Sequence, residues 1–161
     1  MSNEDPRWLD PTQQNAWRAL VSVVTRLPAA LDTQMQRDSD MTHFEYFVLA
    51  LLSENPERRL RLNALAAEAN ASLSRLSHVV TRLEKRGWVQ REPVPGSRGS
   101  YAVLTDAGYD TVVEAAPSHV EAVRRLVFDG LDDDQVRALA RLGSALVEQI
   151  DEGIAGGIGK A

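Results

Sequence analysis

The sequence predicts a mainly α-helical fold that carries one small β-hairpin. Apolar residues recur at three- and four-residue spacing through most of the chain, as they do along the buried face of a helix. The pattern changes to strand-like alternation at 88–91 and 100–104. The segment 93–99 between them contains proline and glycine and cannot be helical. The expected order is two helices, a short strand, two helices, the hairpin and two final helices.

The composition is that of a globular protein. Of the 161 residues, 43% are hydrophobic and 25% are charged, so the chain can bury a core as one domain with helical extensions. No apolar run approaches the ~20 residues that span a bilayer. The polar, acidic N-terminus does not resemble a secretory signal, so we expect a cytoplasmic protein with no membrane partner. The absence of cysteine excludes disulfides and thiolate chemistry.

Two helices are expected in the first third of the chain. The first should begin at Thr12 as its N-cap, and Pro28 should bend or break it. The second should begin at Thr42, which can form a capping box with Glu45. Its expected buried residues are Phe44, Phe47, Val48, Leu51 and Leu52. A short strand within 58–62 could pair with the later hairpin.

The middle of the chain predicts a helix-turn-helix. An alanine-rich helix over 63–69 is followed by a turn and a helix over 73–86, which Ser72 caps and Gly87 terminates. The expected core residues of this longer helix are Leu76, Val79, Val80 and Leu83. Its opposite face carries Ser74, Arg75, His78, Thr81, Arg82 and Lys85. A basic helix followed at once by a hairpin with Arg98 at its tip has the outline of a winged helix-turn-helix.

The last two helices have apolar stripes that their own small domain cannot cover. Thr105 and Asp106 should cap the first of them, and Pro117 should interrupt it. The acidic run 132–134 suits the N-terminus of the second. The stripe of this second helix is Val136, Leu139, Leu142, Leu146 and Ile150. Because the N-terminal helix has a similar stripe, we expect a symmetric homodimer.

Charge is distributed unevenly along the chain. The net charge is −5, yet residues 58–98 hold nine Lys/Arg and three Asp/Glu, and the remainder holds nine and twenty. A basic block in an acidic chain is typical of a nucleic-acid-binding face, although a solvated charged surface has the same composition. We therefore predict a DNA-binding domain at 42–105 and a helical dimerisation domain at 12–36 plus 106–152.

Residues 42–105 resemble the MarR family of bacterial winged-helix regulators. The resemblance is carried by the segment 62–89, which contains RLEKRGWV, and by the wing sequence RGSYAVLTDAG at 98–108. The family usually has Asp two residues before the wing arginine, where this chain has Gly96. The resemblance implies a homodimer formed by the terminal helices, a recognition helix in the major groove of double-stranded DNA and a wing in the minor groove. It also implies a regulator, often a repressor, that a small ligand releases.

The candidate base-reading residues lie in the first half of the recognition helix, which reads the major groove. Arg75 can bind a guanine edge through two hydrogen bonds, and His78 can donate to or accept from a base edge. Ser74 lies on the same face. Thr81 could reach either a base methyl or a phosphate.

The candidate phosphate contacts surround these residues. Ser72 lies at the N-terminus of the helix, where backbone N–H groups favour a phosphate. Arg82, Lys85 and Arg86 lie farther along and could contact either the DNA backbone or acidic neighbours, so an intramolecular ion pair of Arg82 stays open. Arg98 suits a narrow minor groove, whose negative potential attracts arginine.

The resemblance also implies an effector site between the dimerisation helices and the DNA-binding lobe. Its candidate residues are Trp17, Met41, Phe44 and Phe47, for each of which ordinary core packing is the competing interpretation. A small aromatic effector, such as a phenol, would suit them. Without cysteine, regulation by thiol oxidation is excluded.

No catalytic chemistry is expected. The three histidines, His43, His78 and His119, fall on separate predicted helices without carboxylates at metal-ligand spacing. No phosphate-binding loop or nucleophile motif occurs, so we expect no enzyme, metal or cofactor. The remaining alternative is a winged-helix module whose basic face binds an acidic protein instead of specific DNA.

Overall fold

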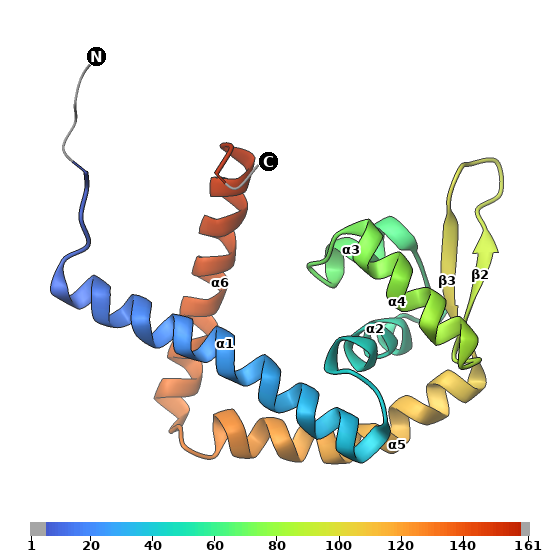
Figure 1. Ribbon diagram of the computed structural model, residues 1–161, viewed down its shortest axis with the longest axis horizontal. Helices are drawn as coiled ribbons and strands as arrows, with labels where there is room; N and C mark the ends of the chain where they lie inside the picture. The colour runs from blue at the N-terminus through green and yellow to red at the C-terminus, as the bar shows by residue number, and fades with distance from the viewer. Residues whose placement is uncertain (1–5, 159–161) are drawn as a thin grey trace. The chain divides into compact units, whose positions relative to one another are not determined.

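The computed structural model describes residues 6–158 (Figure 1). Within this range the chain is mostly helical and contains a three-stranded antiparallel sheet, which confirms the predicted fold class. The chain divides into two compact units, one ending at Val120 and one beginning at Glu121.

The first helix, α1, spans Pro11–Ser39. Its N-cap is Asp10, whose carboxylate accepts the N–H of Gln13 at 2.8 Å, so the prediction of Thr12 as the cap is wrong by two residues. Proline at the first helical position explains the shift, because its missing N–H would have no partner there anyway. Pro28 does not break α1. A proline removes only its own hydrogen bond, and the neighbouring turns keep theirs.

The second helix, α2, spans His43–Glu54 and begins with the predicted capping box. Its buried residues are Glu45, Tyr46, Val48, Leu49 and Leu52. Phe47 is 36% exposed, so its assignment to the core is wrong. The buried positions follow the three- and four-residue spacing of one helix face, and Phe47 lies on the opposite face. Phe44 and Leu51 pack against the core only partly buried.

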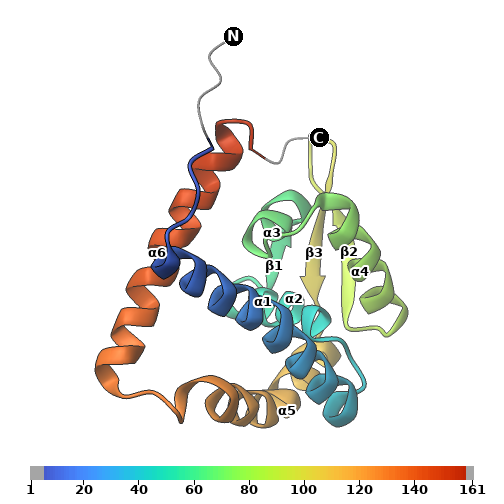
Figure 2. The same cartoon turned by 60° about the vertical axis from the view of Figure 1, so that its left-hand side comes forward.

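The helix-turn-helix and the hairpin follow α2 in the first unit. The elements are β1 (Arg59–Arg61), α3 (Leu62–Glu68), α4 (Leu73–Lys85), β2 (Val89–Pro93) and β3 (Ser100–Leu104). The strands lie in the order β1-β3-β2, and Figure 2 shows β3 between its two neighbours. The predicted pairing of the short strand with the hairpin is therefore confirmed. The hairpin of β2 and β3 projects beside α4 as a wing (Figure 1).

The core holds α4 in place. Leu76, Val79, Val80 and Leu83 are all buried, as predicted, against α2, α3 and the sheet. Gly87 has φ +75° and terminates α4, with its N–H bonded to Glu84 O at 2.9 Å and that of Trp88 to Leu83 O at 3.0 Å. This left-handed position favours glycine. It turns the chain directly from α4 into β2.

The helix α5 spans Asp106–Val123 and connects the two units. The Thr105 hydroxyl accepts the N–H of Gly108 at 3.0 Å and donates to Gly87 O at 2.7 Å, which confirms its capping role. A Cβ at Gly108 would collide with the carbonyl oxygen of Trp88, so this close approach requires glycine. Pro117 lies inside α5 without interrupting it, contrary to the prediction.

The second unit contains the end of α5, the π-helical segment Arg124–Phe128 and α6 (Asp133–Ala155). Asp132 caps α6 in a box with Gln135, as the acidic run predicts. None of this unit's described residues is buried, and Leu142 and Ile150 are 60% and 56% exposed. Among residues 6–158, no helix combines the length and the hydropathy required to cross a membrane.

Candidate nucleic-acid interface

The polar face of α4 is open to solvent. The Ser72 hydroxyl caps the helix by accepting the N–H of Arg75 at 3.2 Å. Exposed side chains then follow along one side of the helix: Ser74, Arg75, His78, Thr81, Arg82 and Lys85. All of the side chains predicted to contact DNA from α4 are therefore accessible in the single chain.

The two main candidates for base readout are both held by neighbours. The guanidinium carbon of Arg75 lies 4.1 Å from the ring centroid of Phe44. The Nδ1 of His78 lies 2.8 Å from Ser74 O, and because a carbonyl can only accept, Nδ1 is the donor. The Nε2 of a neutral His78 is then an acceptor, available to a donor group on a base edge.

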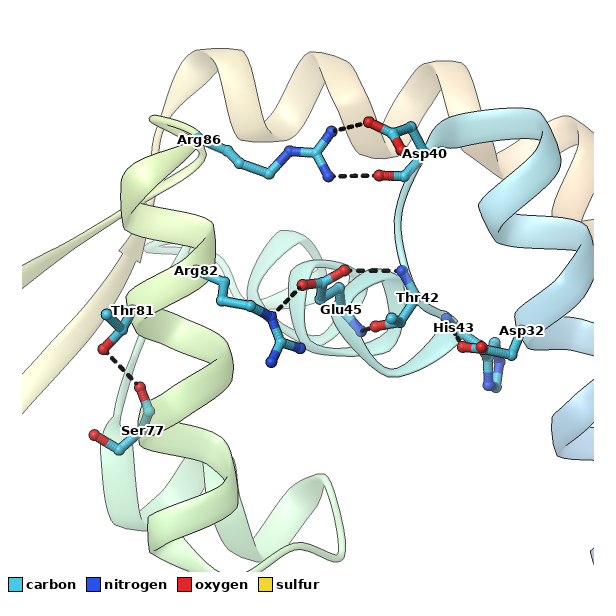
Figure 3. A network of polar contacts seen from close by, with 9 residues as sticks. All are labelled: Asp32, Asp40, Thr42, His43, Glu45, Ser77, Thr81, Arg82 and Arg86. Atoms are coloured by element: carbon cyan, nitrogen blue, oxygen red, sulfur yellow. Dashed lines mark hydrogen bonds and ion pairs between the residues drawn. The ribbon is translucent and has the colours of Figure 1, made fainter.

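Arg82 is joined to α2 by an ion pair (Figure 3). Its Nε donates to Glu45 Oε1 at 2.8 Å, and Glu45 Oε2 accepts the Thr42 N–H at 2.8 Å. Burial acts to raise the pKa of Glu45, but the hydrogen bonds from Thr42 and Arg82 outweigh it and hold that pKa below its ordinary value. The intramolecular pair that the sequence left open for Arg82 is thus present.

Arg86 makes a second link between α4 and the connector after α1 (Figure 3). Its guanidinium donates to Asp40 O at 2.5 Å and to the Asp40 carboxylate at 3.3 Å. It also stacks on Trp88, with 3.8 Å from the guanidinium carbon to the ring centroid. Together, the Arg82 and Arg86 contacts join α4 to α2 and to the connector between α1 and α2.

The hydroxyl of Thr81 is already engaged. It donates to Ser77 O at 2.9 Å (Figure 3) and accepts from Arg91 at 3.2 Å. Arg91 also pairs with Glu84 and donates to Ser77 O at 2.9 Å. This leaves the Thr81 methyl as its freer group, which favours contact with a base methyl over contact with a phosphate.

The basic block separates into paired and unpaired cations. Ion pairs involve five of its nine members: Arg58, Arg59, Arg82, Arg86 and Arg91. The other four have no ion-pair partner among residues 6–158: Arg61, Arg75, Lys85 and Arg98. These four carry the positive charge that an anionic ligand would meet. Sequence reasoning missed Arg61, whose only signal was its place at the end of a short basic strand.

The wing presents Arg98 through its backbone. Gly96 and Gly99 adopt φ of +67° and +129°, and Val94 N–H bonds to Gly99 O at 3.2 Å. Val94 is buried at the base of this turn. The turn geometry therefore places Arg98 at an exposed tip without the aspartate that the family usually has at position 96.

Two hollows flank α4. One, of about 420 Å³, is lined by Asp32, Thr42, Phe44, Arg75, His78, Val79 and Arg82. The other, of about 400 Å³, lies between α4 and the wing. Of the four candidate effector residues, Phe44 lines the first of these two hollows, and Trp17, Met41 and Phe47 line neither. Met41 is buried in the core, whereas Trp17 and Phe47 are exposed, so the structure does not gather these four residues into one site.

A histidine pair packs at the base of α2 within the first unit. The ring centroids of His43 and His119 are 5.3 Å apart, and His119 lies 4.5 Å from the Tyr46 ring. Burial lowers the pKa of both histidines, and the neighbouring His43 lowers that of His119 further. Within the described residues no group of His, Asp and Glu could hold a metal ion.

The arrangement of α3, α4 and the β2–β3 hairpin defines a winged helix-turn-helix protein. The MarR family pattern matches residues 41–99. The solved structure of Sco3205 from Streptomyces coelicolor, a MarR family transcriptional regulator in complex with DNA, is 46% identical. The match covers 91% of this chain and 92% of that one, with a TM-score of 0.87. AbsC from the same organism is 36% identical over 91% of this chain and 99% of its own, with a TM-score of 0.85.

A curated relative matches over a shorter region. The regulator PecS of Dickeya dadantii (strain 3937) is 32% identical over 83 residues, which are 51% of this chain. The chain therefore matches 48% of PecS, about half of its length. On the near full-length likeness to Sco3205 and AbsC, the chain belongs to the MarR family of transcriptional regulators.

Proposed function

We propose that the protein is a cytoplasmic, sequence-specific DNA-binding repressor. The observation that carries the proposal is a set of solvent-exposed cations along α4 and the wing with no ion-pair partner among residues 6–158: Arg75, Lys85 and Arg98. Arg75, His78 and Ser74 would contact base edges and the Thr81 methyl a base methyl, while Ser72, Arg82 and Lys85 would support them at the DNA backbone. The relative Sco3205 was solved in complex with DNA, which supports the same partner here.

We further propose a homodimer that binds a pseudo-palindromic operator. Apolar side chains on α1 and α6, among them Trp17, Val24, Leu142 and Ile150, are more than half exposed in the single chain. Exposed apolar stripes of this kind are typical of a protein interface. The DNA-binding domain would be residues 42–105, with dimerisation through 12–36 and 106–152. Twofold recognition helices would lie about 34 Å apart, one turn of B-DNA.

Release by a small aromatic acid is the last part of the proposal. The 420 Å³ hollow is lined by the Phe44 ring and by Arg75 and Arg82. An aromatic carboxylate is complementary to them, because its ring can pack on Phe44 and its carboxylate can pair with the arginines. A ligand there would compete with DNA for Arg75. A mobility-shift titration with 4-hydroxybenzoate tests this part, because displacement of DNA supports it and unchanged binding at millimolar ligand contradicts it for this class of acid.

The main test is a salt-titrated mobility shift with wild-type protein and Arg98→Ala on a selected site and on random DNA. We expect a sequence preference for wild-type, and for Arg98→Ala a loss of affinity on both DNAs with a shallower salt dependence. Ser97→Ala, in the same turn, is the control. Binding of an acidic protein without any DNA preference would overturn the proposal.

Sedimentation of wild-type and Leu142→Asp tests the dimer, which the substitution should dissociate.

A further inference from the structure

The hollow between α4 and the wing brings together three separate elements. It is lined by Arg61 and Asn63 at the junction of β1 and α3, by Ser77 on α4, and by Arg98 and Ser100 of the wing. Its volume is about 400 Å³. The two arginines come from opposite ends of the basic block in the sequence, and only the fold makes them line one hollow.

The chemistry of this hollow is that of an anion site. No acidic side chain lines it, and neither Arg61 nor Arg98 has an ion-pair partner within the described residues. The Oδ1 of Asn63 accepts the N–H of Ala64 at 3.0 Å, so its amide NH₂ is the group left to donate to a ligand. Leu73, 52% exposed at the first turn of α4, adds an apolar wall. Cations, amide donors and an apolar wall together suit a sugar–phosphate chain.

The sheet fixes Arg61 relative to the wing. Arg61 pairs with Tyr101 in the β1–β3 ladder, one residue from Ser100. Its guanidinium carbon lies 5.8 Å from the centroid of the Tyr101 ring. The position of Arg61 is therefore set by strand pairing and not by a loop. Because β3 is also a strand of the wing, Arg61 and the wing are held in one sheet.

We propose that this hollow binds the DNA strand that runs between the two grooves, and that Arg61 contacts a phosphate there. The inference rests on the proposed function. If α4 occupies a major groove and the wing the adjacent minor groove, the single sugar–phosphate strand that separates these grooves must cross between α4 and the wing. The anionic strand then meets Arg61 on one side and Arg98 on the other.

The test compares Arg61→Gln with Arg59→Gln. Both residues lie on β1, two positions apart, but Arg59 is paired with Glu57 and does not line the hollow. Binding to the selected site and to random DNA is measured over a salt series for each full-length variant. For Arg61→Gln we expect an equal fold loss on both DNAs and a salt slope reduced by about one phosphate contact per subunit. Arg59→Gln and the charge-conserving Arg61→Lys should keep the wild-type slope.

A duplex with single neutral methylphosphonate linkages locates the contact. When the phosphate that Arg61 contacts is neutralised, wild-type protein should bind more weakly than it binds the unmodified duplex. Arg61→Gln should bind the two duplexes equally, because it has already lost that contact. Wild-type protein that binds its selected site, with an unchanged slope in Arg61→Gln, would overturn this inference and leave the proposed function standing. Wild-type protein without sequence preference would overturn both. Thermal unfolding of each variant establishes that any loss reflects binding and not folding.

Discussion

The guanidinium carbon of Arg75 lies 4.1 Å from the centroid of the Phe44 ring, so a residue of α2 supports the main candidate for base readout on α4. A cation over an aromatic face gains about 0.5–1 kcal/mol at an exposed site. The ring also restricts the rotamers of a long side chain that would otherwise be free. If Arg75 reads a base as proposed, Phe44 acts through Arg75 and is a positioning residue.

Phe44→Leu should lower the discrimination between the selected site and a site changed at the base that Arg75 reads. The reason is that the guanidinium loses its support and samples more orientations. Phe44→Tyr keeps an aromatic face and should retain the discrimination. Competition binding with the two duplexes measures the discrimination as the ratio of their affinities. If Arg75→Ala lowers this ratio and Phe44→Leu leaves it unchanged, the ring does not position Arg75.

The Glu45 carboxylate should stabilise the fold in a pH-dependent manner. Its pKa is lowered in the folded state, so its stabilisation is present above the ordinary pKa of a glutamate and is lost as the pH falls through the folded value. Glu45→Gln should therefore be less stable than wild-type at pH 7, by about 1 kcal/mol because Arg82 is half exposed. Urea unfolding at pH 7 and in the acid range should show this difference shrinking. A constant difference would contradict the linkage.

Gly108→Ala should destabilise the protein by about 1–3 kcal/mol, because its Cβ would collide with the Trp88 carbonyl at the start of α5. Gly143→Ala is the matched control, since it lies inside α6 and its Cβ would meet nothing within 4 Å. That control should stabilise by about 0.5–1 kcal/mol through helix propensity. Thermal unfolding measures both. Equal effects of the two substitutions would contradict the close approach.

The His43–His119 pair should make the fold less stable at mildly acidic pH. Both pKa values are lowered in the folded state, so the unfolded chain binds more protons as the pH falls. The stabilisation is present above the ordinary histidine pKa and is lost as the pH falls through the folded values. His119→Gln should flatten the change in unfolding free energy between pH 7.5 and 5. Identical pH slopes in wild-type and His119→Gln would contradict this.

Local chemistry determined much of the architecture from the sequence alone. The caps at Thr42 and Ser72, the buried stripe of α4 and the stop at Gly87 each depend on residues within about four positions, so pattern predicts them. Two other local predictions, the cap at Thr12 and the break at Pro28, are wrong. Each rests on the preference of a single residue, which the rest of a long helix outweighs. The face of α4 that would meet DNA was therefore predictable residue by residue.

Only the tertiary structure decided which cations of the block have an ion-pair partner within the described part of the chain. Arg82 meets Glu45 and Arg86 meets Asp40 across 37 and 46 residues, whereas Arg61 comes to line the same hollow as Arg98 through β-sheet pairing. Arg75 gained its support from a phenyl ring on another helix. Composition specifies the amount of charge in the block, but the availability of each charge depends on partners that are distant in sequence, and these are set by the packing of the core.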